Sequence, residues 1–217
     1  MPIIDLTHVI CPDMPVFPGT KPPALELANT LETDGFIEHR ITMYSHTGTH
    51  VDAPAHLFQD GPTLDSFDIE RFVGKGVRFD FINQNRKEIK VIDLKCLEPL
   101  LKQGWEFLLL NTGWSDYWGS SRYFAGFPHL SLDAAQWLTQ FNLKGIGIDA
   151  ISIDPMESTD YAVHKILMKR NILIIENLTN LTLINNEKFL FGVMPLNTRL
   201  ADGAPVRAFA VTGELCF

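Results

Sequence analysis

The sequence is poor in cysteine and in long apolar runs. Its three cysteines, Cys11, Cys96 and Cys216, are far apart and form no C-x-x-C pair, which argues against a disulfide framework and a cysteine-rich zinc site. No stretch approaches the roughly 18 consecutive apolar residues of a membrane span, and the N-terminus lacks a basic segment followed by an apolar one. A cytoplasmic protein in a reducing compartment is therefore expected.

Positive charge is also scarce. The 217 residues carry a formal net charge of -8, and the longest run of Lys or Arg is Lys169-Arg170. A protein that binds nucleic acid or an anionic membrane neutralises phosphates with a basic stripe, which this sequence lacks. We therefore expect a small-molecule substrate as the partner, and neither nucleic acid nor a membrane.

What the chain does contain is an ordinary globular composition, with 46% hydrophobic and 20% charged residues. The sequence shows no internal repeat, low-complexity tract or Ser/Gly linker, so residues 1–217 are expected to form a single domain. The proline-rich stretch from Pro12 to Pro23 is expected to be an extended arm.

Short apolar or alternating runs predict strands, and three longer segments predict helices. The predicted strands are Ile3 to Leu6, Ala24 to Ala28, Ile37 to Met43, Val77 to Ile82, Phe107 to Leu110, Ile146 to Ile151, Ile172 to Ile175 and Val206 to Val211. The predicted helices are Asp93 to Lys102, Leu132 to Phe141 with Ser131 as N-cap, and Tyr161 to Arg170. The runs that are apolar on both faces are typical of central strands covered on each side. The pattern predicts a mixed α/β fold.

Three of the seven histidines lie close together in the run HTGTHVDAPAH. They are His46, His50 and His56, and the same run contains Asp52. Neutral imidazoles and a carboxylate are the usual ligands of zinc, manganese and iron, and a catalytic site needs about three protein ligands with one position left open. The sequence therefore predicts a divalent metal site in this run.

Backbone geometry limits how the run can hold an ion. On a straight strand His46 and His50 would be roughly 13 Å apart, too far to share one ion. A helix would turn Asp52 to another face, and Pro54 disfavours its continuation. Gly48 permits a positive φ between the two histidines. We therefore expect a compact loop in which the polar side chains converge.

The run from His46 to His56 resembles the signature of a known family. The pattern H-x-G-T-H-x-D-x-P-x-H is that of the cyclase-like metal-dependent hydrolases, which include bacterial kynurenine formamidases and isatin hydrolases, and every fixed position is present from His46 to His56. Family-like stretches also occur from Asp13 to Gly19, from Asn111 to Trp114 and from Gly147 to Pro155. The resemblance covers nearly the whole chain and implies a swivelling β/β/α cyclase-like fold with a mixed sheet around the metal-binding loop.

The resemblance also implies a role for each residue. The implied metal ligands are His46, His50, Asp52, His164 and Glu176. Asp52 would bridge two ions, and His56 would be the catalytic acid/base. His164 lies in a predicted helix and Glu176 closes a predicted strand, so their positions agree with the periodicity. Zinc is expected, with manganese as the alternative, and the residues suit one or two ions per subunit.

Phe17 marks a departure from the family pattern. Kynurenine formamidases usually carry a tryptophan in the segment P-V-x-P-G, where it packs on the aromatic substrate, whereas this chain has Phe17. We expect Phe17 either to form part of the substrate-binding wall or to anchor the N-terminal segment on the protein core.

The expected reaction is hydrolysis of a small amide or formamide C–N bond by metal-activated water, of the arylformamidase type, with N-formylkynurenine as the family's best-known substrate. The alternatives are an isatin- or lactone-type hydrolase, and a non-hydrolytic cyclase or ligand-binding protein that uses the same metal site. A serine hydrolase is disfavoured because the sequence has no G-x-S-x-G run. Members of the family assemble, so a homodimer or homotetramer is expected.

Overall fold

The structure, a computed structural model, describes residues 1–84, 86–185 and 188–213. The strands are β1 (Ile3–Asp5), β2 (Ala24–Asn29), β3 (Glu38–Thr42), β4 (His50–Asp52), β5 (Val73–Asp80), β6 (Glu88–Ile89), β7 (Phe107–Asn111), β8 (His129–Leu130), β9 (Gly145–Ile148), β10 (Leu173–Glu176), β11 (Lys188–Pro195) and β12 (Gly203–Val211). The α-helices are α1 (Leu31–Asp34), α2 (Val91–Leu94), α3 (Glu98–Lys102), α4 (Leu132–Leu138) and α5 (Ala162–Met168). The 3-10 helices are η1 (Pro54–His56), η2 (Leu64–Ser66), η3 (Ile69–Phe72), η4 (Lys95–Leu97), η5 (Trp114–Tyr117), η6 (Ser121–Phe124) and η7 (Leu181–Leu183).

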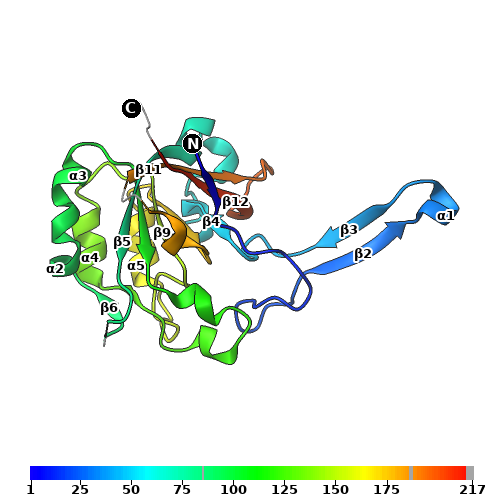
Figure 1. Cartoon of the computed structure of the whole chain (residues 1–217), viewed down its shortest axis with the longest axis horizontal. Coiled ribbons are helices and arrows are strands. Elements are labelled where there is room, and N and C mark those ends of the chain that lie inside the picture. The colour runs from blue at the N-terminus through cyan, green and yellow to red at the C-terminus, as the bar shows by residue number, and fades with distance from the viewer. Residues whose placement is uncertain (85, 186–187, 214–217) are drawn as a thin grey trace.

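Eight of the strands form one mixed sheet that closes on itself. Their order is β1-β12-β11-β5-β7-β9-β10-β4, and β4 also pairs with β12, which closes the ring. Strands β5, β7, β9 and β10 are parallel to one another, whereas β4, β11 and β12 are antiparallel to their neighbours. The predicted mixed α/β fold is therefore confirmed, in the form of a closed, barrel-like sheet (Figure 1).

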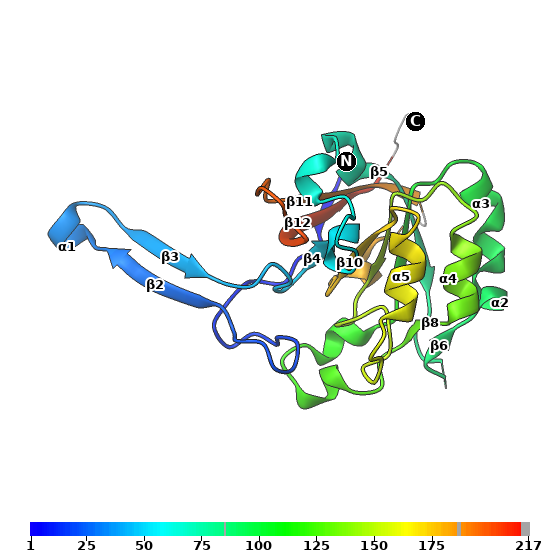
Figure 2. The ribbon, with the colours of Figure 1, turned by 180° about the vertical axis from the view of Figure 1, so that it is seen from behind.

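The central strands are buried on both faces, as their apolar sequences predicted. In β7, Leu108 and Leu110 pack toward α4 and α5, whereas Phe107 and Leu109 face the inside of the closed sheet. Each fully buried side chain of this kind contributes roughly 1.5–3 kcal/mol to stability. Helices α2 to α5 thus cover one side of the sheet (Figure 2). A second apolar cluster fills the interior of the closed sheet.

Two of the three predicted helices are confirmed with small changes at their ends. Helix α4 begins after Ser131, whose hydroxyl accepts a hydrogen bond from the N–H of Ala134 at 3.2 Å, so Ser131 is the N-cap. Helix α5 lies within the segment predicted from Tyr161 to Arg170. It places His164 on the side of the sheet that the helices cover.

The single helix predicted from Asp93 to Lys102 is wrong. The 3-10 turn Lys95–Leu97 separates α2 from α3. Pro99 lies in the first turn of α3, where its missing N–H has no intrahelical partner to lose. In the middle of a continuous helix its ring would clash with a carbonyl of the preceding turn, so a new helix begins at Glu98 instead.

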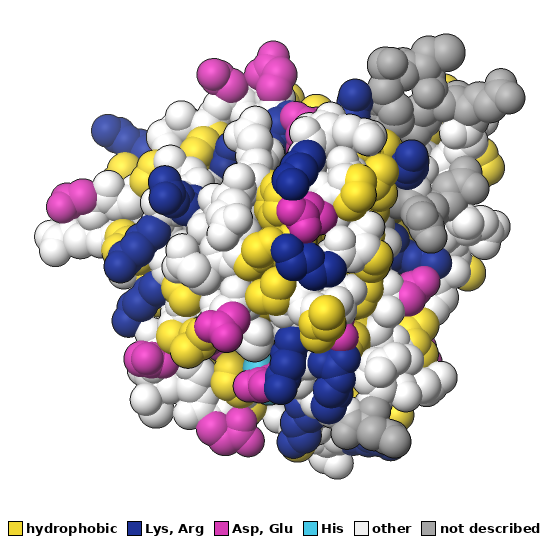
Figure 3. Space-filling model, turned by 90° about the vertical axis from the view of Figure 1, so that its left-hand side faces the viewer, with side chains coloured by type: hydrophobic (Ala, Val, Ile, Leu, Met, Phe, Trp, Pro, Cys, Tyr) yellow, Lys and Arg dark blue, Asp and Glu magenta, His cyan; other side chains and the backbone are white. Residues whose placement is uncertain are grey.

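The surface at α2 and α3 carries charges of both signs. Lys95 and Lys102 each pair with Glu98, at 3.0 and 2.8 Å. Figure 3 shows Lys and Arg side chains interspersed with Asp and Glu on this side of the molecule. Exposed pairs of this kind stabilise the fold by no more than about 1 kcal/mol each.

The sequence predicted neither disulfide bonds nor a membrane-spanning segment. Cys11 and Cys96 are free cysteines, and Cys216 lies outside the described residues. Within the described ranges, no helix has the length and apolar character to cross a bilayer.

The stretch from Pro12 to Pro23 is not the extended arm that its prolines predicted. It contains two turns, in which the N–H of Met14 donates to the carbonyl of Cys11 at 3.2 Å and the N–H of Thr20 donates to the carbonyl of Phe17 at 3.0 Å. These hydrogen bonds fold the stretch back on itself, so a different part of the chain projects from the molecule.

The projecting element is the hairpin of β2 and β3 (Figures 1 and 2). Leu25 pairs with Ile41 and Leu27 pairs with His39, so these side chains share one face of the hairpin. Leu27 and Ile41 are each 56% exposed. The hairpin therefore presents an apolar face that the rest of this chain does not cover.

Candidate metal centre

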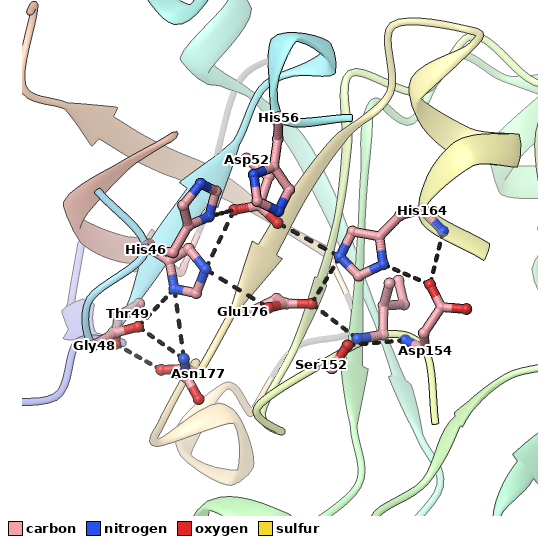
Figure 4. Close-up of polar contacts among 12 residues, drawn as sticks. His46, Gly48, Thr49, Asp52, His56, Ser152, Asp154, His164, Glu176 and Asn177 are labelled. Carbon is pink, nitrogen blue, oxygen red and sulfur yellow. Dashed lines mark hydrogen bonds and ion pairs between the residues drawn. The ribbon is translucent and has the colours of Figure 1, made fainter. Parts of the chain in front are cut away.

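Separate elements carry the residues that the sequence predicted for the site. His46 lies in the loop before β4, His50 and Asp52 in β4, His56 at the end of η1, His164 in α5 and Glu176 at the end of β10. Together with Phe17, all of them line one cavity of about 320 Å³. The structure thus brings every predicted site residue to the same cavity. Figure 4 shows His46, Asp52, His56, His164 and Glu176 pointing toward one another.

The histidine run is part loop and part strand. Gly48 has a φ of 64°, which turns the chain between the first two histidines as predicted. From His50 to Asp52, however, the chain is β4, paired with β10 on one side and β12 on the other, so the prediction of a loop throughout is wrong. The turn folds His46 back, and its ring centroid lies 5.2 Å from that of His50.

The register of β4 and β10 sets the direction of the polar side chains. Glu176 lies opposite His50, and Val51 packs in the apolar cluster inside the closed sheet. Because side chains alternate along a strand, His50 and Asp52 point to the opposite face, the one that α5 covers. His164 reaches the same face from that helix.

Asp52 lies between two groups of ligand atoms. Its Oδ1 is 2.7 Å from Nδ1 of His46 and 3.2 Å from Nε2 of His50. Its Oδ2 is 3.7 Å from Nε2 of His164, which in turn is 3.3 Å from Oε1 of Glu176. Asp52 therefore belongs to two groups of three residues, and it offers one carboxylate oxygen to each. We call these groups the two triads; the first is His46, His50 and Asp52, and the second is Asp52, His164 and Glu176.

These separations fit a divalent metal ion. Ligand atoms held at about 2.0–2.2 Å in a tetrahedron are roughly 3.3 Å from one another, close to the observed values. In each triad the potential ligand atoms lie within 4.8 Å of one another. Imidazole nitrogens and carboxylate oxygens are also the donors that catalytic zinc and manganese sites use.

The hydrogen bonds of His50 give a second, independent indication of a cation. Its Nδ1–H donates to the carbonyl of Gly48 at 2.8 Å. Its Nε2 then faces Oδ1 of Asp52 at 3.2 Å and Oε2 of Glu176 at 3.6 Å, and both carboxylates are buried. A ring nitrogen with a lone pair cannot face two buried carboxylates unless a proton or a metal ion lies between them.

His164 and His46 each also form a hydrogen bond through the ring nitrogen that points away from Asp52. Nδ1–H of His164 donates to Oδ2 of Asp154 at 2.5 Å, and Nε2–H of His46 donates to Oδ2 of Asp202 at 3.0 Å. Such partners fix the tautomer and orientation of a ligating histidine. Neither aspartate was predicted as a site residue. Asp202 is 156 positions from His46 in the sequence, whereas Asp154 is only 10 positions from His164 and lies in the family-like stretch from Gly147 to Pro155, which could have indicated it.

The electrostatics of the site favour positive charge. Burial disfavours the charged form of His46, but the nearby Asp52 and the hydrogen bond to Asp202 outweigh it and raise its pKa to about 10. Burial is likewise outweighed at His164, whose pKa is raised by its bonds to Asp154 and other carboxylates. The carboxylates that hold these protons would also attract a metal ion, and binding of the ion would release the protons.

His56 lies beside the two triads. Its ring lies against that of His46 in a tilted arrangement, with centroids 3.9 Å apart and an angle of 38° between the planes. Its Nδ1 is 3.6 Å from Oδ2 of Asp202. Burial lowers the pKa of His56, so the neutral form of the ring is favoured.

Aromatic and apolar side chains complete the cavity. Phe17, which is 37% exposed, lines it together with Tyr44 and Tyr161. Tyr161 has a positive φ of 51° directly before α5, a backbone conformation that is uncommon for an aromatic residue. The cavity therefore joins a polar centre to a wall on which an aromatic ring can pack.

Comparisons with known proteins agree with this geometry. A profile of the family described as "Putative cyclase" matches residues 4–155. Kynurenine formamidase of Bacillus mycoides is 34% identical over 206 residues, which cover 94% of this chain and 95% of that protein. Isatin hydrolase A from Labrenzia aggregata has a TM-score of 0.88 at 25% identity, over 98% of this chain and 94% of that one. A structure described as a "Potential Metal-Dependent Hydrolase With Cyclase Activity" has a TM-score of 0.79 at 28% identity, over 96% of each chain. By sequence and by fold, the chain belongs to the cyclase family of metal-dependent hydrolases.

Proposed function

We propose that the protein hydrolyses the C–N bond of a small aryl formamide, the class of substrate after which its kynurenine formamidase relatives are named. The observation that carries this proposal is the position of Asp52, which faces two imidazoles with one carboxylate oxygen and a third with the other. A buried carboxylate shared in this way suits a bridge between two metal ions.

The proposed ligands follow from these contacts. We assign His46, His50 and Asp52 to one ion, and Asp52, His164 and Glu176 to a second. Zinc is the proposed ion, with manganese as the alternative, because imidazole and carboxylate donors suit both. An ion bound there would polarise a carbonyl and lower the pKa of a water molecule from 15.7 toward about 7.

The side chains around the ions would bind the substrate and move its protons. His56, favoured in its neutral form, would take a proton from the attacking water and pass it to the leaving nitrogen. Phe17 would pack against the aromatic ring of the substrate, in place of the tryptophan of related formamidases. A cavity of about 320 Å³ lies at the small end of ligand sites, which favours a substrate with one aromatic ring system.

A second candidate function is hydrolysis of a cyclic amide such as isatin, or of a lactone. The fold similarity to isatin hydrolase A favours it, and Phe17 departs from the tryptophan usual in kynurenine formamidases. The chemistry would be the same attack on a carbonyl, followed by ring opening. A non-hydrolytic cyclase with the same metal site is the remaining alternative.

The proposal extends to the whole molecule. We propose that residues 1–217 act as one domain of the swivelling β/β/α type, as a homodimer or homotetramer in the cytoplasm. A match to full-length relatives over 94% of the chain supports the single domain. The free thiols support a reducing compartment, and the charge of -8 supports a small-molecule partner and argues against nucleic acid or a membrane.

The first test is metal content followed by rates. We expect the purified protein to bind zinc or manganese and to hydrolyse N-formylkynurenine, isatin or both. His56→Ala should keep the metal, since His56 is not an assigned ligand, but lose about 10²- to 10⁴-fold in turnover, as expected for removal of an acid/base. Metal analysis and steady-state kinetics measure the two effects.

The matched control is His129→Ala, because the His129 side chain lies outside the cavity lining. This variant should behave as the wild type. Bound metal with neither substrate turned over would contradict the proposed substrates but not the site. Absence of metal under every loading condition would contradict the site itself.

A further inference from the structure

Asp202 reaches the site from a part of the chain that no sequence pattern singled out. It directly precedes β12, and its carbonyl accepts a hydrogen bond from the N–H of Ala53 at 2.9 Å. Its neighbour Gly203 lies opposite Asp52 in the β12–β4 ladder. The backbone of Asp202 is therefore fixed to the strand that carries the metal ligands.

The side chain of Asp202 contacts two imidazoles. Its Oδ2 accepts a hydrogen bond from Nε2 of His46 at 3.0 Å and lies 3.6 Å from Nδ1 of His56. Nδ1 of His46 is 2.7 Å from Asp52. The ring of His46 thus lies between the carboxylates of Asp52 and Asp202. The carboxylate of Asp202 also lies close to the ring of His56.

Gly203 is shaped around the same ring. A Cβ atom on Gly203 would lie 2.5 Å from Cε1 of His46, closer than real contacts of this kind. The ring therefore packs against bare backbone at this position. Two consecutive residues therefore hold the ring of His46 in place. Asp202 accepts its hydrogen bond, and Gly203 leaves room for the ring because it has no side chain.

The other imidazole ligands show the same arrangement. In His50 the outer N–H donates to the carbonyl of Gly48, and in His164 it donates to Asp154, while the inner nitrogen faces Asp52. A ligating histidine almost always gives its second N–H to a carboxylate, a carbonyl or a water molecule. Asp202 holds the equivalent place for His46.

A competing interpretation is that Asp202 is itself a metal ligand. Ligand atoms of His46, His56 and Asp202 lie within 4.8 Å of one another and could hold an ion. His46 would then bind one ion through each nitrogen, which requires loss of both ring N–H protons. A hydrogen bond from Nε2–H to Asp202 needs no such loss, so the acceptor role is favoured.

We propose that Asp202 is a positioning residue of the metal site, which turns Nδ1 of His46 toward Asp52 and keeps the ring of His56 against the ring of His46. This inference rests on the proposed function, because it takes His46 as a metal ligand and His56 as the acid/base. It adds a residue that acts through these two rings and not directly on the substrate.

The test compares Asp202→Ala and Asp202→Asn with the wild type. Zinc affinity is measured by competition with a chromophoric chelator, and the ligand environment by the visible spectrum of the cobalt-loaded protein. Asp202→Ala should bind zinc about 10- to 100-fold more weakly and change the cobalt spectrum. Asp202→Asn should lose less than about tenfold, because its amide oxygen can still accept the N–H of His46. On any substrate turned over, kcat should fall more than KM changes.

The control is Asp60→Ala, which removes an exposed carboxylate without a hydrogen bond or ion pair among the described residues and should leave affinity and spectrum unchanged. Wild-type affinity and spectrum in Asp202→Ala would overturn the proposal, as would a third bound ion that this variant loses. If Asp202→Ala does not fold, Asp202→Leu, which is close to aspartate in size but offers no acceptor to His46, takes its place, with the same expected loss of affinity and the same contradicting result. A wild type that binds metal but hydrolyses neither substrate would contradict only the proposed substrates, whereas one that binds no metal would overturn both proposals.

Discussion

A chain of hydrogen bonds connects the metal site to the buried interior beside it. Asn177 donates from Nδ2 to the carbonyl of Gly48 at 2.8 Å, the same carbonyl that accepts Nδ1–H of His50. The hydroxyl of Tyr123 donates to Oδ1 of Asn177 at 2.7 Å, which fixes the orientation of the amide. The orientation of the groups around His50 therefore depends in part on Tyr123, which does not itself line the cavity but holds Asn177, which does.

Tyr123→Phe tests this chain. The change leaves Oδ1 of Asn177 buried without its donor, so we expect the free energy of unfolding to fall by about 1–3 kcal/mol. Urea unfolding at equilibrium measures the loss. Tyr117→Phe is the matched control, because the described residues give the hydroxyl of Tyr117 no hydrogen bond and its ring can keep its contact with Arg122. Equal stability of the two variants would contradict the chain.

At the scale of elements, one carboxylate both accepts hydrogen bonds from the start of a helix and orients a proposed metal ligand. Oδ1 of Asp154 accepts the N–H of Val163 at 3.0 Å, and Oδ2 accepts the N–H of His164 at 3.0 Å. These are N–H groups of the first turn of α5, which have no partner within the helix. The same Oδ2 accepts the ring N–H of His164. The start of α5 and the direction of its histidine are therefore set together.

Helix α4 offers a test of capping away from the site. Ser131→Ala removes the acceptor for the N–H of Ala134, so the free energy of unfolding should fall by about 1 kcal/mol, within a range of about 0.5–2 kcal/mol. Ser131→Asn keeps an acceptor and should stay close to the wild type. Chemical denaturation measures stability, and metal content should be unchanged in both variants. A loss of the same size in Ser131→Asn would show that the hydroxyl is not acting as a cap.

At the scale of the whole molecule, the β2–β3 hairpin has an apolar face that the described residues of the chain leave exposed. An isolated two-stranded hairpin is marginally stable in water, and this one projects from the body with Leu27 and Ile41 largely exposed. Burial of its apolar face by a second copy of the chain would remove this exposed surface. The proposed assembly gives the hairpin that partner.

Leu27→Lys tests the assembly. A charge in the middle of the apolar face should oppose its burial, so the variant should have the mass of a monomer or a smaller oligomer where the wild type is a dimer or tetramer. Arg40→Gln changes the opposite face of the hairpin and should keep the wild-type mass. Light scattering coupled to size-exclusion chromatography gives both masses. A monomeric wild type, or equal masses for all three proteins, would contradict this interface.

Strand prediction succeeded where apolar residues gave a regular signal. Phe107 to Leu110 and Ile172 to Ile175 were predicted because uninterrupted apolar runs are typical of buried central strands, and both are strands. Lys188–Pro195, the strand β11, was not predicted. The short strand β4 was taken for a loop, because its residues were interpreted as ligands and not as members of a ladder. Pairing partners, which define both strands, come from distant segments that a local pattern does not contain.

By itself the sequence determined the type of site. The spacing of His46, His50, Asp52 and His56 within one short run predicted metal binding, because ligand chemistry and the turn at Gly48 are local properties of the chain. The resemblance extended the prediction to His164 and Glu176, and the structure places both beside Asp52.

Only the tertiary structure decided which groups orient these side chains and which segment projects from the molecule. Asp202 contacts His46 because β12 pairs with β4, and Asn177 holds the carbonyl of Gly48 because β10 ends beside the loop. Such contacts join residues far apart in the chain, and hydrogen bonds depend on positions set to a fraction of an ångström. Closure of the sheet fixes those positions, and no local periodicity carries that information.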